Sequence, residues 1–287
     1  MAESFTKKVI ETHLTLASGS FGGQGNTKII RGLATDVSIE RPGLPDKDKA
    51  RVKIYNLPLQ EMEQLTTLAF KPLQVRKNII RILAGSENNL SEVFNGDITS
   101  AFGNFNNAPD PVFEIEALCG YYASIQPSSP TSISGSTPVA DVISKVAQQI
   151  GYSFINQGVT SSLRNAVLNG SPMEQAINAA KQVGAQLLVN DTTMTLLNAN
   201  EALSGNAVLL NKETGMIGYP TFNNEGIIVK SLYNNAFKFN GLVKVESIVP
   251  KATGIWRITK LTHNLSAFNS QGGQWISEIE ATYTGAM

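Results

Sequence analysis

The sequence predicts a mainly β (α+β) fold in which two antiparallel β-barrel or sandwich domains flank a small α/β domain. Three observations carry this prediction. Polar and apolar residues alternate with a period of two in the first and last thirds of the 287-residue chain, which is typical of half-buried strands. Apolar residues adopt helical spacing in the middle segment, and a Pro- and Ser-rich stretch separates that segment from the first third. The predicted domains are residues 1–125, 126–202 and 203–287.

The first third is predicted to form strands. Residues 9–16 alternate, a Gly-rich loop occupies 18–26, and an extended run follows at 27–40. Because an extended run rather than a helix follows the glycines, the loop does not match a dinucleotide-binding fingerprint. The other predicted strands of this domain are residues 51–56, 75–83, 93–102 and 112–120.

One helix interrupts these strands. Pro58 suits a helix start, because the first turn does not need the backbone N–H that proline lacks. Glu61 and Glu63 lie in the early turns, where the positive end of the helix dipole favours acidic residues. The apolar residues at helical spacing are Leu59, Met62, Leu65 and Leu68.

The middle segment begins with a connection and a helix. Residues 126–136 are rich in Pro and Ser, so we expect them to link two domains. Thr137 is the expected N-cap, with Pro138 in the first helical position and Gly151 at the end. The expected apolar stripe is Val139, Val142, Ile143, Val146 and Ile150, followed by a strand at 152–155.

A second helix and a hairpin follow in the same segment. Ser171 and Glu174 match a capping box, with Pro172 between them, and Gly184 is expected to end the helix. The helix stripe is Met173, Ile177, Ala180 and Val183, and the hairpin strands are residues 186–189 and 193–197 around Asn190 and Asp191. Together these elements predict a small α/β unit.

The last third returns to extended patterns. Asn234 and Asn235 mark one turn, and Gly272 and Gly273 mark another. In the last strand, Trp275, Ile279, Ala281 and Tyr283 are expected on one face. The predicted strands are residues 226–232, 237–249, 254–268 and 275–283.

Two fragments of the first third recur in the last third. Both chance similarity between amphipathic strands and duplication of one β domain explain such matches. Under duplication, a trimer would present six similar domains around one axis and would match a six-fold partner. The matching fragments are Ser100-Ala-Phe102 with Ser266-Ala-Phe268, Glu114-Ile-Glu-Ala117 with Glu278-Ile-Glu-Ala281 and, more weakly, Val52-Lys-Ile54 with Val243-Lys-Val245.

Composition and charge exclude several classes of protein. Hydrophobic residues make up 42% and the net charge is +0, which excludes a disordered chain and gives no global attraction to nucleic acid or an anionic membrane. The apolar runs are too short for a membrane span. Charges at Glu3, Lys7, Lys8 and Glu11 leave no apolar core for a secretory signal. Cys119 is the single cysteine and cannot form an internal disulfide, so we expect the protein to be made in a reducing cytoplasm.

Charge is distributed unevenly along the chain. Residues 1–81 carry an excess of basic side chains, residues 82–200 an excess of acidic ones, and residues 201–287 are nearly balanced. Ordinary variation on solvated faces explains this distribution, and so do complementary surfaces in a head-to-tail assembly.

The residues that carry most enzyme chemistry are few. His13 and His263 are the two histidines, and no HExxH, CxxC, Gly-x-Ser-x-Gly or Walker motif occurs. A thiol nucleophile would pair Cys119 with a histidine, but Cys119 lies on the apolar face of its predicted strand, where cysteine acts as a small hydrophobe. We therefore predict no catalytic, cofactor-binding or metal-binding residue.

Two charged groups require a separate interpretation. Glu114 and Glu116 share one strand face, roughly 7 Å apart from the strand rise, a separation that suits carboxylate-pair glycoside hydrolysis. The same pattern at Glu278 and Glu280 favours a solvated or interfacial face instead. A basic cluster would suit phosphate contacts or protection of a strand edge against aggregation; it consists of Lys71, Arg76, Lys77 and Arg81.

Several segments carry a resemblance to a known family. They are Gly215-Met-Ile-Gly-Tyr-Pro-Thr221, Gly226-Ile-Ile-Val-Lys-Ser-Leu232, Asn240-Gly-Leu-Val-Lys-Val-Glu-Ser247, Gly254-Ile-Trp-Arg-Ile-Thr-Lys-Leu-Thr-His263 and Gly272-Gly-Gln-Trp275, with Arg51-Val-Lys-Ile-Tyr-Asn-Leu57 near the start. This succession resembles the central baseplate hub proteins of contractile-tailed bacteriophages, which are adapters between the tail tube and the spike.

The resemblance implies two tube-like β domains and a non-enzymatic homotrimer in the virion baseplate, where the six-fold tail tube meets the three-fold spike. The implied partners are other copies of the chain, the tail tube or its initiator, and the spike, with the tape measure protein and baseplate wedge components as further candidates. We expect assembly in the host cytoplasm, with no cofactor, no membrane span and no specific nucleic-acid binding. DNA would pass along the axis, and an acidic middle segment that lined the axis would repel this DNA rather than bind it.

Three alternatives stay open. Another tail tube or distal-tail ring protein would form hexamers. A tail-associated peptidoglycan hydrolase would use Glu114 and Glu116. A carbohydrate-binding β module would need Trp256 and Trp275 to be exposed, although core packing is favoured for both.

Overall fold

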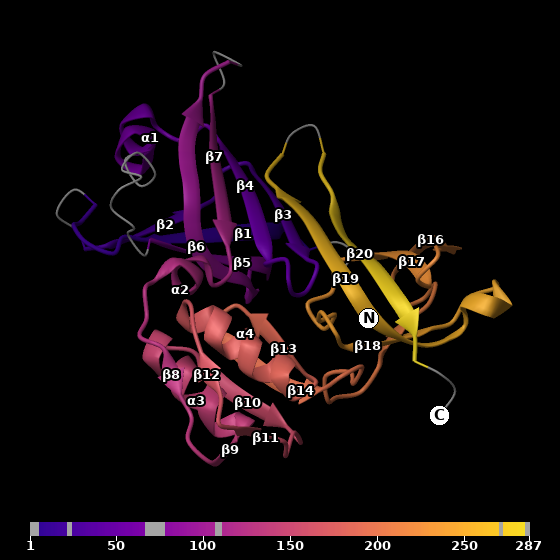
Figure 1. Cartoon of the computed structure of the whole chain (residues 1–287). Coiled ribbons are helices and arrows are strands. Elements are labelled where there is room, and N and C mark those ends of the chain that lie inside the picture. The colour runs from indigo at the N-terminus through magenta and orange to yellow at the C-terminus, as the bar shows by residue number, and fades with distance from the viewer. Residues whose placement is uncertain (1–5, 22–24, 67–77, 107–110, 270–271, 285–287) are drawn as a thin grey trace. The chain divides into compact units, whose positions relative to one another are not determined.

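The computed structural model describes residues 6–21, 25–66, 78–106, 111–269 and 272–284. The chain divides into two compact units, and its fold is mainly β, as predicted (Figure 1). Unit 1 comprises Met1–Pro42, Asp48–Leu118 and Gly205–Met287, and unit 2 comprises Gly43–Lys47 and Cys119–Ser204. The first and last thirds of the chain therefore share one unit, and the division into three domains stays a prediction.

The N-terminal part of unit 1 forms the predicted strands and helix. Its elements are β1 (Lys8–Thr15), β2 (Thr27–Arg31), β3 (Thr35–Arg41), β4 (Lys49–Tyr55), α1 (Leu59–Thr66), β5 (Ile79–Ser86), β6 (Asn89–Asn104) and β7 (Val112–Leu118). The extended run at 27–40 splits into two strands, because Gly32 turns the chain between them with a φ of 83°. The strand predicted at 75–83 begins as β5 at Ile79; residues 75–77 and Leu68 lie outside the described residues.

These strands and the helix enclose one apolar core. Val52 of β4 and Ile115 of β7 are each 1% exposed, and α1 contributes Met62 and Leu65 to the same cluster. Burying an apolar side chain of this size stabilises the fold by roughly 1.5–3 kcal/mol. The period-two pattern of the sequence is thus the pattern of core contacts.

The C-terminal part of unit 1 is also built from strands. Its elements are β15 (Val208–Leu210), β16 (Met216–Phe222), β17 (Ile227–Leu232), β18 (Leu242–Val245), η1 (Pro250–Ala252), β19 (Gly254–Ala267) and β20 (Trp275–Tyr283). The strands predicted at 226–232, 254–268 and 275–283 are confirmed. Ile279 and Ala281 of β20 face the core as expected, and Ser277 lies on the same buried face.

The strand predicted at 237–249 is wrong over most of its length. Only β18 is extended there, because two turns precede it. Phe237 N–H donates to Asn234 O at 3.2 Å, and Gly241 N–H donates to Lys238 O at 3.0 Å. Asn240 adopts a φ of 61°, so buried residues of this segment reach the core from turns. The short β15 and the β16 strand, which contains glycine and proline, were not predicted as strands.

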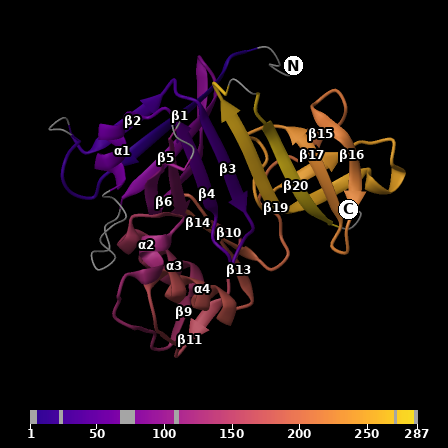
Figure 2. The ribbon, with the colours of Figure 1, turned by 90° about the horizontal axis from the view of Figure 1, so that it is seen from above.

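The two parts of unit 1 follow the same strand order. Neighbouring strands run β3-β4-β7-β6-β5 in the first part and β16-β17-β20-β19-β18 in the second. All neighbours in both series are antiparallel. The C-terminal half of β19 also pairs with β3, so the two series share one continuous sheet (Figure 2). Each strand of one series therefore has an equivalent in the other.

Unit 2 is the small α/β unit. Its elements are α2 (Tyr121–Ile125), β8 (Thr131–Ser132), β9 (Ser136–Pro138), α3 (Val139–Ile150), β10 (Ser153–Gln157), β11 (Ser162–Arg164), β12 (Val167–Leu168), α4 (Pro172–Gln182), β13 (Ala185–Asn190) and β14 (Thr193–Asn198). The predicted β13–β14 hairpin forms, and β10 pairs with β14 in parallel. The short helix α2 was not predicted, and the connection expected at 126–136 contains β8 and the first residue of β9.

Helix ends in unit 2 largely follow the sequence signals. Ser171 and Glu174 form the predicted capping box at α4: Glu174 N–H donates to Ser171 Oγ at 3.3 Å, and Ser171 N–H donates to Glu174 Oε2 at 2.8 Å. Gly151 ends α3 with a φ of 75°. The N-cap predicted at Thr137 is wrong, because Thr137 is paired within β9, and Pro138 precedes the first helical residue in an extended conformation.

Candidate functional site

The two histidines lie on different strands of unit 1. His13 Nε2 on β1 is 2.6 Å from Glu11 Oε1. His263 on β19 is 3% exposed, and its Nδ1 is 2.8 Å from Ser277 Oγ. Burial, with the positive charges of Arg41 and Lys238, lowers the pKa of His263 to about 3. His263 is therefore neutral at pH 7 and acts as a packed core residue.

Cys119 begins unit 2 rather than ending a strand. Strand β7 stops at Leu118, and Gly120 turns the chain toward α2 with a φ of 66°. The Cys119 side chain is 4% exposed, and its Sγ donates to the backbone oxygen of Asp191 at 3.0 Å. The predicted strand position is thus wrong, whereas its burial agrees with the role of a small hydrophobe.

The repeated glutamates take part in ion pairs across neighbouring strands. The pairs are Arg51–Glu116, Lys230–Glu278 and Lys260–Glu280, with N–O distances of 3.1 Å, 3.2 Å and 3.2 Å. Glu114 instead accepts a hydrogen bond from Asn104 Nδ2 at 3.0 Å. Exposed ion pairs contribute about 0–1 kcal/mol each to the free energy of unfolding. These contacts therefore mainly neutralise the charge of a solvated or interfacial face and add little to the stability of the fold.

The predicted basic cluster is only partly described. Arg81 on β5 pairs with Glu92 on β6, which makes it a cross-strand ion pair. Lys71, Arg76 and Lys77 lie outside the described residues.

The two tryptophans are held by the protein itself. Trp256 is 5% exposed, and its Nε1 donates to Ala252 O at 2.9 Å. Trp275 is partly buried against the first core and meets the Tyr233 ring edge-on, with centroids 5.6 Å apart. Neither ring offers the open face that a sugar-stacking platform needs, so the carbohydrate-binding alternative loses its support.

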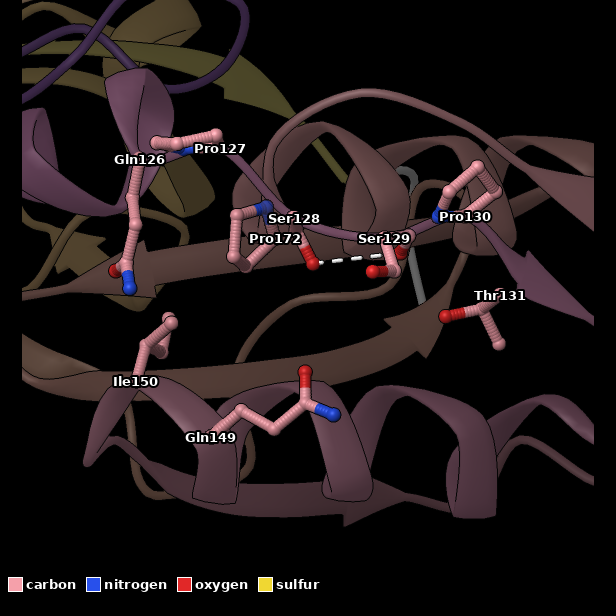
Figure 3. A pocket seen from close by; sticks show the side chains of 9 residues that line it. All are labelled: Gln126, Pro127, Ser128, Ser129, Pro130, Thr131, Gln149, Ile150 and Pro172. Carbon is pink, nitrogen blue, oxygen red and sulfur yellow. Dashed lines mark hydrogen bonds between the residues drawn. The ribbon is translucent and has the colours of Figure 1, made fainter.

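Unit 2 contains a cavity of about 420 Å³ (Figure 3). Its lining is Gln126, Pro127, Ser128, Ser129, Pro130, Thr131, Gln149, Ile150 and Pro172. None of these side chains is charged, and a serine nucleophile needs a neighbouring base, so the cavity has no catalytic constellation. Within the described residues there is also no group of His, Cys, Asp or Glu that could hold a metal ion. No described helix is long and apolar enough to cross a membrane.

The equivalent hairpins β6–β7 and β19–β20 share a local feature. Each contains a bulge, at Thr99 in the first hairpin and at Thr259 in the second. Thr99 Oγ1 donates to Glu116 O at 3.1 Å, and Thr259 Oγ1 donates to Glu280 O at 3.2 Å. The hydroxyl satisfies the carbonyl opposite the bulge, where the regular ladder is interrupted. The fragments Glu114–Ala117 and Glu278–Ala281 therefore occupy equivalent positions.

The register corrects the other two sequence matches. Counted from the bulges, the equivalent of Ser100–Phe102 is Lys260–Thr262, and not the fragment that begins at Ser266. The equivalent of Val52–Ile54 is Val229–Ser231 on β17, because Lys53 faces Glu114 as Lys230 faces Glu278. An Ile-Thr dipeptide ends at each bulge, so this dipeptide marks the equivalent positions in the sequence.

Several strand edges of unit 1 have no partner among the residues that the structure describes, at β2, β15, β16 and the C-terminal end of β6. Strand β16 pairs with β17 alone, at the end of the sheet. Strand β6 pairs with β5 only as far as Asp97, so Ala101–Asn104 has β7 on one side and no described strand on the other. The exposed large apolar side chains here are Ile217, Tyr219 and Phe222 near the edge of β16 and Phe102 and Phe105 near that of β6. Exposed apolar strand edges are sites of pairing with another chain.

Comparisons with known proteins agree with this architecture. The 43 kDa tail protein of prophage MuSo2 from Shewanella oneidensis is similar in structure, with a TM-score of 0.63, 12% identity and 97% of both chains covered. A tail protein from Neisseria meningitidis MC58 gives a TM-score of 0.63 at 11% identity, with 95% of this chain and 96% of that chain covered. The E. coli c3393 protein is a type VI secretion component with structural similarity to T4 bacteriophage tail proteins gp27 and gp5. It gives a TM-score of 0.59 at 8% identity, with 94% of this chain and 76% of that chain covered.

A search of the curated proteins found no match. A family model, described as "Baseplate hub gp41", matches residues 9–271 and so spans most of the chain. The family is a structural one, in agreement with the prediction that the chain is not an enzyme. The chain belongs to the baseplate hub gp41 family and is a structural component of the bacteriophage tail baseplate.

Proposed function

We propose that the chain forms a homotrimer that joins the six-fold tail tube to the three-fold spike. The observation that carries this proposal is the repeated strand order in unit 1. Three chains with two equivalent strand series each would present six similar surfaces around one axis. Such a ring would match a hexameric tube on one side while it keeps three-fold symmetry for the spike.

The charge pattern of the sheet supports a passive channel wall. On the face that carries Glu116, Glu278 and Glu280, each carboxylate is matched by a lysine or arginine on the next strand. Balanced pairs give DNA little net attraction, because binding to phosphates needs an excess of cations. This differs from the acidic wall considered from the sequence, since basic residues of 1–81 face the acidic residues of β7.

Light scattering of the purified chain tests the assembly. We expect a mass three times the 30.9 kDa of one chain. A six-fold multiple would indicate a tube-like ring instead, and a monomer would contradict the proposal. For the partners, we expect the trimer to co-sediment with assembled tail tube and to co-purify with the spike protein. Binding to neither would refute the adapter role.

A further inference from the structure

We propose that β16 of one chain pairs with the C-terminal end of β6 of a second copy, antiparallel, with Thr221 opposite Asn104 and Phe222 opposite Gly103. This inference rests on the proposed ring of like chains and names the contact that would close it. Strand β16 ends the sheet of unit 1, and β6 lies several strands away from it, between β7 and β5 (Figure 1). One chain cannot satisfy both edges, but a head-to-tail neighbour can.

The chain itself contains the template for this contact. Strand β3 of the first series pairs antiparallel with the C-terminal half of β19 in the second series, and Ser38 lies opposite Asn264. In the repeated strand order, β16 is equivalent to β3, and β6 is equivalent to β19. The open edges of β16 and β6 therefore belong to the same two strand types that already pair once within the chain.

The registers fix which residues would meet. Ser38 faces Arg51 on β4, and Thr221 faces Ile228 on β17, at equivalent positions. On the other strand, the first residues after the two bulges are Lys260 and Ser100, which are equivalent. Asn264 lies four residues after Lys260, and Asn104 lies four residues after Ser100. Thr221 thus corresponds to Ser38, and Asn104 corresponds to Asn264.

The side chains at these positions are chemically matched. Within the chain, Ser38 Oγ donates to Asn264 Oδ1 at 2.9 Å. The open edges carry Thr221 and Asn104, which again pair a hydroxyl with an amide. The same hydrogen bond would therefore connect two chains. Thr221 and Asn104 therefore match Ser38 and Asn264 in residue type and in register, and none of these side chains belongs to the apolar core of either series.

Equivalent side chains of β3 and β16 differ in their exposed fraction as this pairing requires. Ile39, beside Ser38, is 0% exposed where β3 is covered by β19, whereas its equivalent Phe222 is 53% exposed. Tyr219 is 65% exposed on the same strand. Pro220 has no N–H to offer a neighbour, but it lies in the irregular stretch between Ile217 and Thr221, so the proposed pairing starts after it.

Disulfide trapping tests the pairing in the full chain. The variant Thr221→Cys/Asn104→Cys should give covalent dimers and trimers on mild oxidation, because directly opposed residues lie about 4.5–5.5 Å apart at Cα, within disulfide range. A matched control moves one partner by two residues, Thr221→Cys/Phe102→Cys, where the separation of about 7–8 Å should prevent cross-linking. The two single Thr221→Cys and Asn104→Cys variants, which keep Cys119, report any cross-link through that thiol.

A second control establishes that the template behaves as described. Ser38→Cys/Asn264→Cys should form its disulfide within one chain and give no covalent oligomer. If the native mass is three chains and Thr221→Cys/Asn104→Cys does not cross-link, the strand pairing is refuted while the proposed trimer stands. A ladder beyond three chains would confirm the pairing and contradict the closed trimer. A monomer by light scattering with no cross-link would refute both.

Discussion

Replacing Asp48 by alanine tests its buried ion pair with Arg41, the last residue of β3. Arg41 Nη1 is 2.5 Å from Asp48 Oδ2, and the two side chains are only 10% and 4% exposed. Arg41 Nη2 also donates to the backbone oxygen of Val93 at 2.8 Å. Without the carboxylate, the guanidinium keeps its charge in a buried position, which costs about 3–5 kcal/mol. That is a large share of the roughly 5–15 kcal/mol that holds a typical domain folded.

Urea unfolding followed by tryptophan fluorescence measures this loss, because both tryptophans lie in unit 1. The matched control is Glu116→Ala, which removes one partner of Arg51, with side chains 54% and 43% exposed; it should cost less than about 1 kcal/mol. The double variant Arg41→Met/Asp48→Ala should lose less stability than Asp48→Ala alone, since no unpaired charge remains. Equal losses for Asp48→Ala and Glu116→Ala would refute the reasoning.

Three further predictions concern the protonation of His263, the N-cap of α4 and the open edge of β16. The pKa of His263 is about 3 in the folded chain and about 6.5 in the unfolded chain. Its contribution to stability is therefore fully present above pH 6.5, and it decreases at lower pH by up to about 1.4 kcal/mol per pH unit. His263→Gln should therefore flatten the loss of stability between pH 6.5 and pH 4 in urea titrations, and an unchanged slope would contradict the assignment. Ser171→Ala should lower the unfolding free energy of unit 2 by about 1 kcal/mol in circular dichroism melts, whereas Ser128→Ala should not; equal effects would argue against the capping box. Phe222→Lys should shift the trimer toward monomer in light scattering without lowering the melting temperature, while Ile248→Lys, at a position 77% exposed, should leave the mass unchanged. A stable Phe222→Lys trimer would count against edge pairing.

Local signals in the sequence predicted most elements of the fold. Alternation identified β1, β4, β7 and β20, because each strand has one face in a core and one outside it. The capping box at Ser171 was also predictable, since its hydrogen bonds join residues three apart. The alternation at 237–249 was misleading, because turns around Asn234 and Asn240 bring the buried residues of this segment to the core without a strand.

The candidate interface required three-dimensional register. The repeated Glu-Ile-Glu-Ala fragment was visible in the sequence and does mark equivalent positions. The companion match at Ser266 was misleading, because only the bulges at Thr99 and Thr259 define where equivalence is counted from. The pairing of β3 with β19 joins residues 226 apart in sequence at Ser38 and Asn264, and no local pattern carries such a contact.

This separation has a consequence for the order of events during synthesis. Unit 2 draws most of its residues from one continuous stretch, 119–204, so its contacts become available soon after that stretch leaves the ribosome. The β3 edge must wait until β19 is made, because pairing of distant segments comes late in folding. Until then the nascent chain exposes an unpaired strand, which is prone to join with another chain. Folding of unit 1 therefore ends with the C-terminal hairpin, and a truncated chain that lacks it would leave the β3 edge permanently open.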